Sequence, residues 1–145
     1  MKIFIDGSAG TTGLRIKDRL MKRSDVELTT LSEEQRKDTE SRKQALNSAQ
    51  VAFLCLPDAA AVEAVELVEN PDTVIIDTST AHRTSEGWAY GFPELSAEFE
   101  DKIKNSKRIA VPGCHAGGFI ALVYPLVDAG VLGNDALLNC YSLTG

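Results

Sequence analysis

The sequence predicts an α/β fold: a doubly wound, mainly parallel sheet with helices on both of its faces. Three observations support this prediction. Short apolar runs alternate with helical stretches along the chain, two of these runs are apolar without a break, and a glycine-rich turn follows the first run. Unbroken apolar runs are typical of strands that are buried on both faces, as they are in a parallel sheet.

Six strands are expected, each a short run dominated by apolar residues. In chain order they cover Lys2 to Ile5, Val26 to Leu31, Val51 to Leu56, Val74 to Asp77, Arg108 to Val111 and Ala136 to Leu143. The third run and the first three residues of the fourth are wholly apolar. These two strands are therefore expected to be buried on both faces.

The first two helices differ in character. The stretch from Thr12 to Lys22 has one face made by small or apolar residues, Gly13, Ile16 and Leu20. The stretch from Glu33 to Leu46 is polar, and its opposite charges stand four residues apart, at Glu33 and Lys37 and at Asp38 and Arg42. We expect this second helix to lie on the surface with only a thin apolar contact.

The later helices begin at turn residues. Pro57 ends the third strand, and Asp58 is expected to cap an alanine-rich helix that runs to Glu69. A short helix is expected before the fifth strand, and Pro112-Gly113 leads into a helix from about Cys114 to Asp128.

A long loop is expected between the fourth strand and the short helix, from Thr78 to Glu94. It holds the only tryptophan, Trp88, between two glycines. A loop of this length inside a compact domain is usually functional or an insertion.

Length and composition exclude several classes of protein. The chain has 145 residues, enough for one domain, and its 43% hydrophobic and 25% charged residues exclude disorder. A net charge of -6 disfavours nucleic acid as a partner. No apolar run approaches the ~20 residues that span a membrane, and the first residues meet a charge and then a glycine too soon for the apolar region of a secretory signal, so a cytoplasmic protein is expected. Three scattered cysteines without a C-x-x-C pair disfavour a disulfide framework and a metal site.

The glycine-rich turn predicts a dinucleotide site. Glycines between a strand and a helix let the backbone approach a diphosphate, which then lies at the helix amino terminus. The alternative is a purely structural turn, which is disfavoured because the glycines directly follow the first strand. A glycine-rich turn at this position makes the predicted fold Rossmann-like. The cofactor-binding candidates are Gly7, Ser8, Ala9, Gly10, Thr11, Thr12 and Gly13.

The residues after the second strand favour NADP(H) over NAD(H). An NAD site usually has an acidic residue there that binds the ribose hydroxyls. Here Ser32 follows the strand, and Arg36 and Lys37 come shortly after, as would suit a 2′-phosphate. The alternative is that the two cations belong to the solvated face of a helix, where Glu33 and Glu34 accompany them.

The three cysteines are expected to differ. Cys55 and Cys140 stand inside expected strands and are interpreted as small core residues. Cys114 opens a helix, where the N–H groups and the partial positive charge favour the thiolate, so it should be the most acidic thiol and the first to be alkylated. Together with a dinucleotide site, such a thiol suits attack on an activated acyl group followed by hydride transfer to the thioester.

Five motifs in this order resemble the N-acetyl-gamma-glutamyl-phosphate reductase family, in the shorter of its two subfamilies, within the semialdehyde dehydrogenase group. They are Gly7-Ser8-Ala9-Gly10-Thr11-Thr12-Gly13, Cys55-Leu56-Pro57-Asp58, Asp77-Thr78-Ser79-Thr80-Ala81-His82-Arg83, Tyr90-Gly91-Phe92-Pro93-Glu94-Leu95 and Pro112-Gly113-Cys114. The resemblance covers essentially the whole chain. It implies an enzyme of arginine biosynthesis that uses NADPH to reduce a small-molecule acyl phosphate, N-acetyl-glutamyl phosphate, to the semialdehyde.

The resemblance also implies residue roles and a missing part. Cys114 falls on the family's nucleophile, and three residues of the loop after the fourth strand become candidates for contact with substrate or cofactor, namely Ser79, His82 and Arg83. Family members continue into a substrate-binding domain that supplies a catalytic histidine. Residues 1–145 are therefore expected to be the cofactor half of a longer enzyme, which is a homo-oligomer when full length.

One departure from the family pattern follows the nucleophile. The family commonly has an aromatic residue and then Pro-Thr-Gly, whereas this chain has His115-Ala116-Gly117-Gly118. Gly117 thus replaces a hydroxyl that could have helped the active site. His115 is not expected to pair with Cys114, because adjacent helix residues point about 100° apart.

Two alternatives remain open. One is a sibling enzyme, similar to aspartate-semialdehyde dehydrogenase, with the same mechanism and a different acid. The other is a nucleotide-binding or redox-sensing module without a reaction of its own. The loop from Asp77 to Arg83 and the Pro-Gly-Cys turn disfavour the module, which would not need them.

Overall fold

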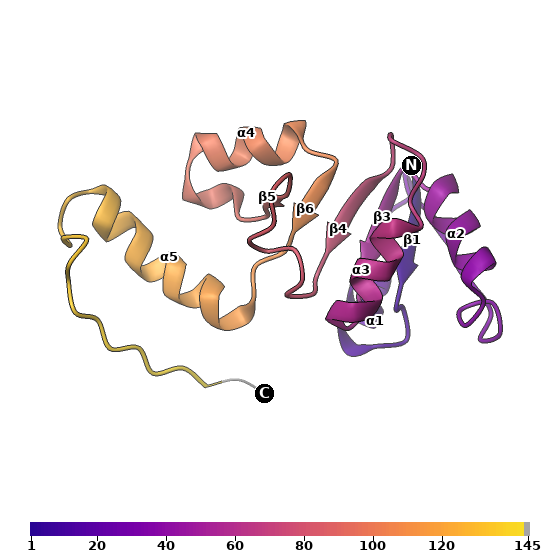
Figure 1. Cartoon of the computed structure of the whole chain (residues 1–145), viewed down its shortest axis with the longest axis horizontal. Helices are drawn as coiled ribbons and strands as arrows, with labels where there is room; N and C mark the ends of the chain where they lie inside the picture. Colours follow the sequence, from indigo (N-terminus) through magenta and orange to yellow (C-terminus); the bar gives the residue numbers. More distant parts are fainter. Residues whose placement is uncertain (144–145) are drawn as a thin grey trace.

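The computed structural model describes residues 1–143 and shows a six-stranded sheet flanked by helices (Figure 1). Every pair of neighbouring strands is parallel, in the order β2-β1-β3-β4-β6-β5. The strands are β1 (Lys2–Asp6), β2 (Glu27–Thr29), β3 (Val51–Leu54), β4 (Val74–Asp77), β5 (Ala89–Tyr90) and β6 (Arg108–Ala110). The predicted α/β parallel fold is confirmed.

Four of the helices connect strands that follow each other in the chain, and the fifth follows the last strand. The helices are α1 (Thr11–Leu20), α2 (Thr39–Ser48), α3 (Asp58–Glu66), α4 (Ala97–Asn105) and α5 (Cys114–Asp128), with a short 3-10 helix η1 (Pro93–Leu95) before α4. The chain leaves β1 toward β2 and then returns across β1 to β3, so right-handed crossovers put α1 on one face of the sheet and α2 and α3 on the other. This reversal makes the sheet doubly wound.

The core lies between the sheet and the pair α2 and α3. Large side chains from the strands fill it, Phe4, Leu54 and Ile75 among them. The two helices contribute Leu46 and the alanines at positions 45, 61 and 64, and Ala49 directly after α2 adds to them; these small residues let the helices pack close to the strands. This core fixes β1 and β3 side by side, and with them the loops at their carboxyl ends.

The second helix is shorter than the sequence predicts. It begins at Thr39 instead of Glu33, because Asp38 accepts a hydrogen bond from the Ser41 N–H and caps the helix there. Ser32 and Gln35 exchange hydrogen bonds in the turn that precedes it. Asp38 is therefore a capping residue and does not pair with Arg42.

The carboxyl-terminal part also departs from the expectation. Residues 136–143 form no strand, and Cys140 is exposed there instead of buried. Alternating apolar residues predict a strand only where a neighbour takes up its backbone hydrogen bonds, and no strand among residues 1–143 does so. Conversely, the long loop contains β5, too short to leave a sequence signal. Helix α5 projects away from the sheet and begins and ends where predicted (Figure 1).

Candidate active site

The glycine turn after β1 is fixed by two close backbone contacts. Gly7 has φ +83°, and a Cβ there would lie 2.2 Å from the carbonyl oxygen of Cys55. A Cβ on Gly13 would lie 2.4 Å from the carbonyl oxygen of Gly7. At Gly10 a Cβ would meet its nearest atom at 3.6 Å, an ordinary contact. The first and third glycines are thus required by the fold, whereas Gly10 leaves space beside the start of α1.

An open cavity of about 320 Å³ lies beside this turn, between the carboxyl ends of β1 and β3. Strands are added to the sheet on one side of β1 and then on the other, so the strand order reverses between β1 and β3. Ligands of open α/β sheets bind at such a point. The lining residues of the cavity come from the glycine turn, from α2 and the loop before it, and from the start of α3: Asp6, Gly7, Ala9, Gly10, Arg36, Arg42, Cys55, Leu56, Pro57 and Ala60.

The three residues predicted to favour NADP(H) differ in their placement. Arg36 lines the cavity, and its Nε donates to the backbone oxygen of Ser32 at 3.4 Å. The Ser32 hydroxyl accepts the Gln35 N–H at 3.2 Å. Lys37 is exposed and is not among the lining residues. The structure therefore brings Arg36 to the cavity and leaves Lys37 outside it.

A buried ion pair stabilises the floor of the cavity. Asp6, at the end of β1, is 4% exposed, and the Arg42 guanidinium donates to its Oδ2 from Nε and Nη2, at 3.1 and 3.0 Å. The same guanidinium reaches Glu63 of α3 at 3.3 Å. Arg42 thus ties α2 to both β1 and α3 and compensates the carboxylate beside the glycine turn.

Sequence reasoning missed this pair, since it paired Arg42 with Asp38 on a surface helix. One signal was present: an acidic residue directly before a predicted diphosphate-binding turn needs a cation nearby. Which cation supplies it depends on the packing of α2, which the sequence does not show.

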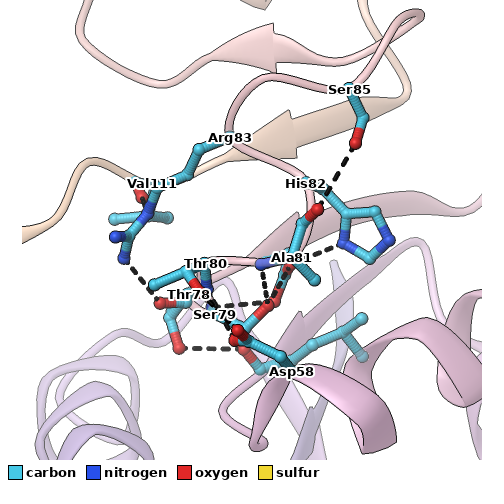
Figure 2. A network of polar contacts seen from close by, with 11 residues as sticks. Asp58, Thr78, Ser79, Thr80, Ala81, His82, Arg83, Ser85 and Val111 are labelled. Atoms are coloured by element: carbon cyan, nitrogen blue, oxygen red, sulfur yellow. Dashed lines mark hydrogen bonds and ion pairs between the residues drawn. The ribbon is translucent and has the colours of Figure 1, made fainter.

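A second polar cluster lies at the carboxyl end of β4 (Figure 2). Asp77 is fully buried and accepts three hydrogen bonds: from the Ser79 N–H at 2.9 Å, from the Ser79 hydroxyl at 2.6 Å and from Nδ1 of His82 at 2.7 Å. The His82 ring stacks on Trp88, with centroids 4.1 Å apart and planes at 11°. Asp77 and Trp88 were not predicted as site residues; here Asp77 is buried with its partners, and Trp88 is partly buried.

All three predicted loop residues make contacts within the protein, and two of them, Ser79 and His82, are buried. The Ser79 hydroxyl donates to Asp77 and also accepts the Ala81 N–H at 3.2 Å. His82 is 9% exposed between Asp77 and Trp88.

Arg83 points to the opposite side of the loop from His82 (Figure 2). Its Nε donates to the Val111 oxygen at 3.0 Å and its Nη2 to the Thr78 oxygen at 3.2 Å. It thus lies between the ends of β4 and β6.

Asp58 connects this loop to the first cavity. It was expected to cap α3 but is the first helical residue, without a capping hydrogen bond. Its carboxylate accepts instead from the N–H and the hydroxyl of Thr80. These hydrogen bonds from Thr80 hold the pKa of Asp58 below its ordinary value. The start of α3 and the loop after β4 are therefore linked at the sheet edge.

The cysteines have three different environments. Cys114 is the first residue of α5, which has no side-chain cap, and it is exposed. Burial raises the pKa of the Cys55 thiol, in keeping with a core role. Cys140, expected to be buried and inert, is exposed. Burial therefore distinguishes Cys114 from Cys55 but not from Cys140. The expectation that Cys114 is alkylated before Cys140 depends on the helix terminus alone.

In the part of the chain that the structure describes, no hydrogen bond joins His115 and Cys114. Nδ1 of His115 lies 2.6 Å from the hydroxyl of Ser142. Within residues 1–143 no group of three or more His, Cys, Asp or Glu side chains could hold a metal ion. The same part of the chain has no helix with the length and apolar character needed to span a membrane.

Comparison with known families decides what these features belong to. The family described as "Semialdehyde dehydrogenase, NAD binding domain" matches residues 2–105, more than two thirds of the chain. This chain belongs to the semialdehyde dehydrogenase family. The match contains the glycine turn and the loop from Asp77 to Arg83, and it ends before Cys114.

Curated relatives of this semialdehyde dehydrogenase domain extend the similarity past Cys114. The chain is 52% identical over 143 residues to "N-acetyl-gamma-glutamyl-phosphate reductase 2" of Pseudomonas putida, covering 99% of this chain and 46% of the relative. It is 52% identical over 144 residues to "N-acetyl-gamma-glutamyl-phosphate reductase" of Chelativorans sp., with the same two shares. The chain thus spans less than half the length of these relatives.

Solved structures of the semialdehyde dehydrogenase family share the fold. Aspartate semialdehyde dehydrogenase of Francisella tularensis matches 90% of this chain with a TM-score of 0.67 and 17% identity, over 41% of that protein. The enzyme of Candida albicans, determined with NADP, matches 88% of this chain with a TM-score of 0.61 and 17% identity, over 46% of that protein. At this identity the likeness concerns the fold alone.

Proposed function

We propose that this chain is the cofactor-binding half of an NADPH-dependent N-acetyl-gamma-glutamyl-phosphate reductase and that Cys114 is its nucleophile. The observation that carries the proposal is the placement of the glycine-turn cavity and the Cys114 turn at the same carboxyl edge of one parallel sheet. The names of relatives about half identical over nearly the whole chain support the choice of acyl phosphate.

The residues of the first cavity fit a dinucleotide. The space at Gly10 and the N–H groups at the start of α1 suit a diphosphate. Arg36 suits the 2′-phosphate of NADP, because it lines the cavity and makes no ion pair with a carboxylate among the described residues. The cofactor, when bound, supplies a hydride to the substrate carbonyl.

Cys114 would act as the nucleophile from an exposed helix start. Its thiolate attacks the carbonyl carbon of the acyl phosphate, a C–S bond forms, and the C–O bond to phosphate breaks as phosphate leaves. The amino terminus of α5 is capped only by the glycine backbone at 113, so its N–H groups are available to the developing oxyanion. With Gly117 in place of a hydroxyl, backbone N–H groups carry this role.

The rest of the enzyme belongs to the proposal as well. A substrate-binding domain after residue 145 would supply the catalytic histidine and the contacts that recognise the small-molecule substrate. The full-length enzyme is proposed to be a cytoplasmic homo-oligomer without a nucleic-acid or membrane partner.

The cofactor choice is tested by changing one cation at a time. Arg36→Ala should weaken NADPH binding about tenfold and NADH binding little, because only NADPH carries the 2′-phosphate that a charged hydrogen bond would hold. Lys37→Ala is the matched control and should leave both affinities unchanged. Calorimetric titration of each variant with the two cofactors measures the result. Equal loss for both cofactors, or tighter binding of NADH by the unaltered chain, would contradict the proposed preference.

A further inference from the structure

We propose that Arg83 is a positioning residue for Cys114: its guanidinium braces the ends of β4 and β6 and holds the turn from which α5 starts. The inference deepens the proposed function, since it rests on Cys114 being the nucleophile. It assigns to Arg83 a role that acts through the backbone.

The brace consists of two hydrogen bonds to strand ends. Thr78 directly follows β4 and Val111 directly follows β6, and these strands are parallel neighbours. The last ladder bond between them runs from the Val111 N–H to the Asp77 oxygen at 2.8 Å. Next to this bond, Arg83 donates to the backbone oxygens of Thr78 and Val111, at 3.2 and 3.0 Å. The planar guanidinium makes both contacts with one rigid group.

The same guanidinium lies against the residue that caps α5. A Cβ on Gly113 would be 2.6 Å from Nη1 of Arg83. Gly113 has φ -77° and ψ 156°, values that any residue adopts. Glycine is therefore not needed here for its backbone conformation; its lack of a side chain leaves room for the guanidinium. Its oxygen accepts the first helical hydrogen bond, from the Gly117 N–H at 2.7 Å. The position of Gly113 therefore sets the start of α5, and with it the Cys114 thiol.

Arg83 is itself held in place by its neighbour. His82 is fixed between the buried carboxylate of Asp77 and the ring of Trp88, on the other side of the loop (Figure 2). The Thr80 N–H donates a hydrogen bond to the carboxylate of Asp58 in α3. The loop that carries Arg83 is thus attached to the sheet and to α3, so the guanidinium has little freedom to move away from Gly113.

The consequence concerns the geometry of the thiol. The helix terminus favours the thiolate only if the sulfur stays close to the first N–H groups. A misplacement of about 1 Å at a reacting group can cost about 10²-fold in rate. Among the charged or titratable side chains, that of Arg83 lies against Gly113, and that of His115, the residue after Cys114, is hydrogen-bonded to Ser142.

The test compares Arg83 with a second arginine that makes the same kind of bridge elsewhere. Nη1 of Arg108 donates to the Thr73 oxygen at 3.0 Å and to the Lys107 oxygen at 3.1 Å, at the amino ends of β4 and β6. Arg108→Met is therefore the matched control for Arg83→Met. Arg83→Lys keeps the positive charge and loses the planar double contact.

The measurement is the rate of iodoacetamide labelling of each cysteine against pH, followed by peptide mass spectrometry on the intact 145-residue chain. Exposed Cys140 is the reference thiol in the same molecule. We expect Arg83→Met and Arg83→Lys each to slow Cys114 labelling at neutral pH about tenfold and to move its pH midpoint upward. Cys140 should not change, and Arg108→Met should match the unaltered chain at Cys114.

Three results would overturn the inference: an unchanged Cys114 profile in Arg83→Met, full recovery in Arg83→Lys, or the same change in Arg108→Met. Recovery by lysine would show that the charge alone matters. Thermal unfolding of each variant identifies one that fails to fold, and Arg83→Lys then decides alone. Because labelling needs no substrate, the result stands apart from the proposed reaction, which fails if Cys114→Ser leaves the full-length enzyme active.

Discussion

Cys114→Ser is expected to lower the rate of acyl-phosphate reduction by the full-length enzyme about 10⁴-fold or more. A serine hydroxyl at this helix start stays protonated near neutral pH and is a weak nucleophile. No other group then replaces the thiolate in the attack that expels phosphate. NADPH binding should be unchanged, because Cys114 is not among the residues that line the glycine-turn cavity. Rate assays and calorimetric titration of the same preparation separate the two effects.

Cys140→Ser is the matched control, since it makes the same change at another exposed cysteine. It should leave both the rate and the affinity for NADPH unaltered. A normal rate in Cys114→Ser would exclude covalent catalysis by this residue, and loss of both rate and binding would indicate misfolding.

The second large effect is expected at the glycine turn. Gly7→Ala should lower the free energy of unfolding by about 4 kcal/mol, the sum of a strained positive φ and a collision with the Cys55 carbonyl oxygen. Gly10→Ala should unfold at the same denaturant concentration as the unaltered chain, because its Cβ meets only an ordinary contact at 3.6 Å.

Gly10→Ala should instead weaken NADPH binding about tenfold, since the methyl group occupies space where the diphosphate approaches the backbone. Urea unfolding and calorimetric titration of the two variants measure these outcomes. Normal NADPH binding by Gly10→Ala would show that the diphosphate does not lie at this turn. Unchanged stability of Gly7→Ala would contradict the close approach of Gly7 to the Cys55 carbonyl oxygen.

The sequence predicted the features that depend on local signals. Apolar runs located five of the six strands of the sheet, all but β5. Glycine spacing located the turn after β1, and Pro112-Gly113 located the first residue of α5. The role of Gly7 was also predictable in kind, because a tight turn between a strand and a helix requires such a residue.

Features that depend on distant partners were not predictable. Arg42 stands 36 positions from Asp6 in the chain, and its spacing from Asp38 suggested a different pair. Asp38 was free to cap α2, which moved the start of that helix from Glu33 to Thr39. A strand at residues 136–143 required a neighbour, and alternation of apolar residues gives no information about one. Cys140 was misplaced for the same reason.

The most direct test of the central proposal is to look for the acyl group on Cys114. The full-length enzyme is mixed with N-acetyl-glutamyl phosphate in the absence of NADPH, quenched in acid, digested and examined by mass spectrometry, while released phosphate is counted. We predict one phosphate released per active site and the acyl group on the peptide that contains Cys114. An acyl group on another residue, or phosphate released only when NADPH is present, would contradict the account.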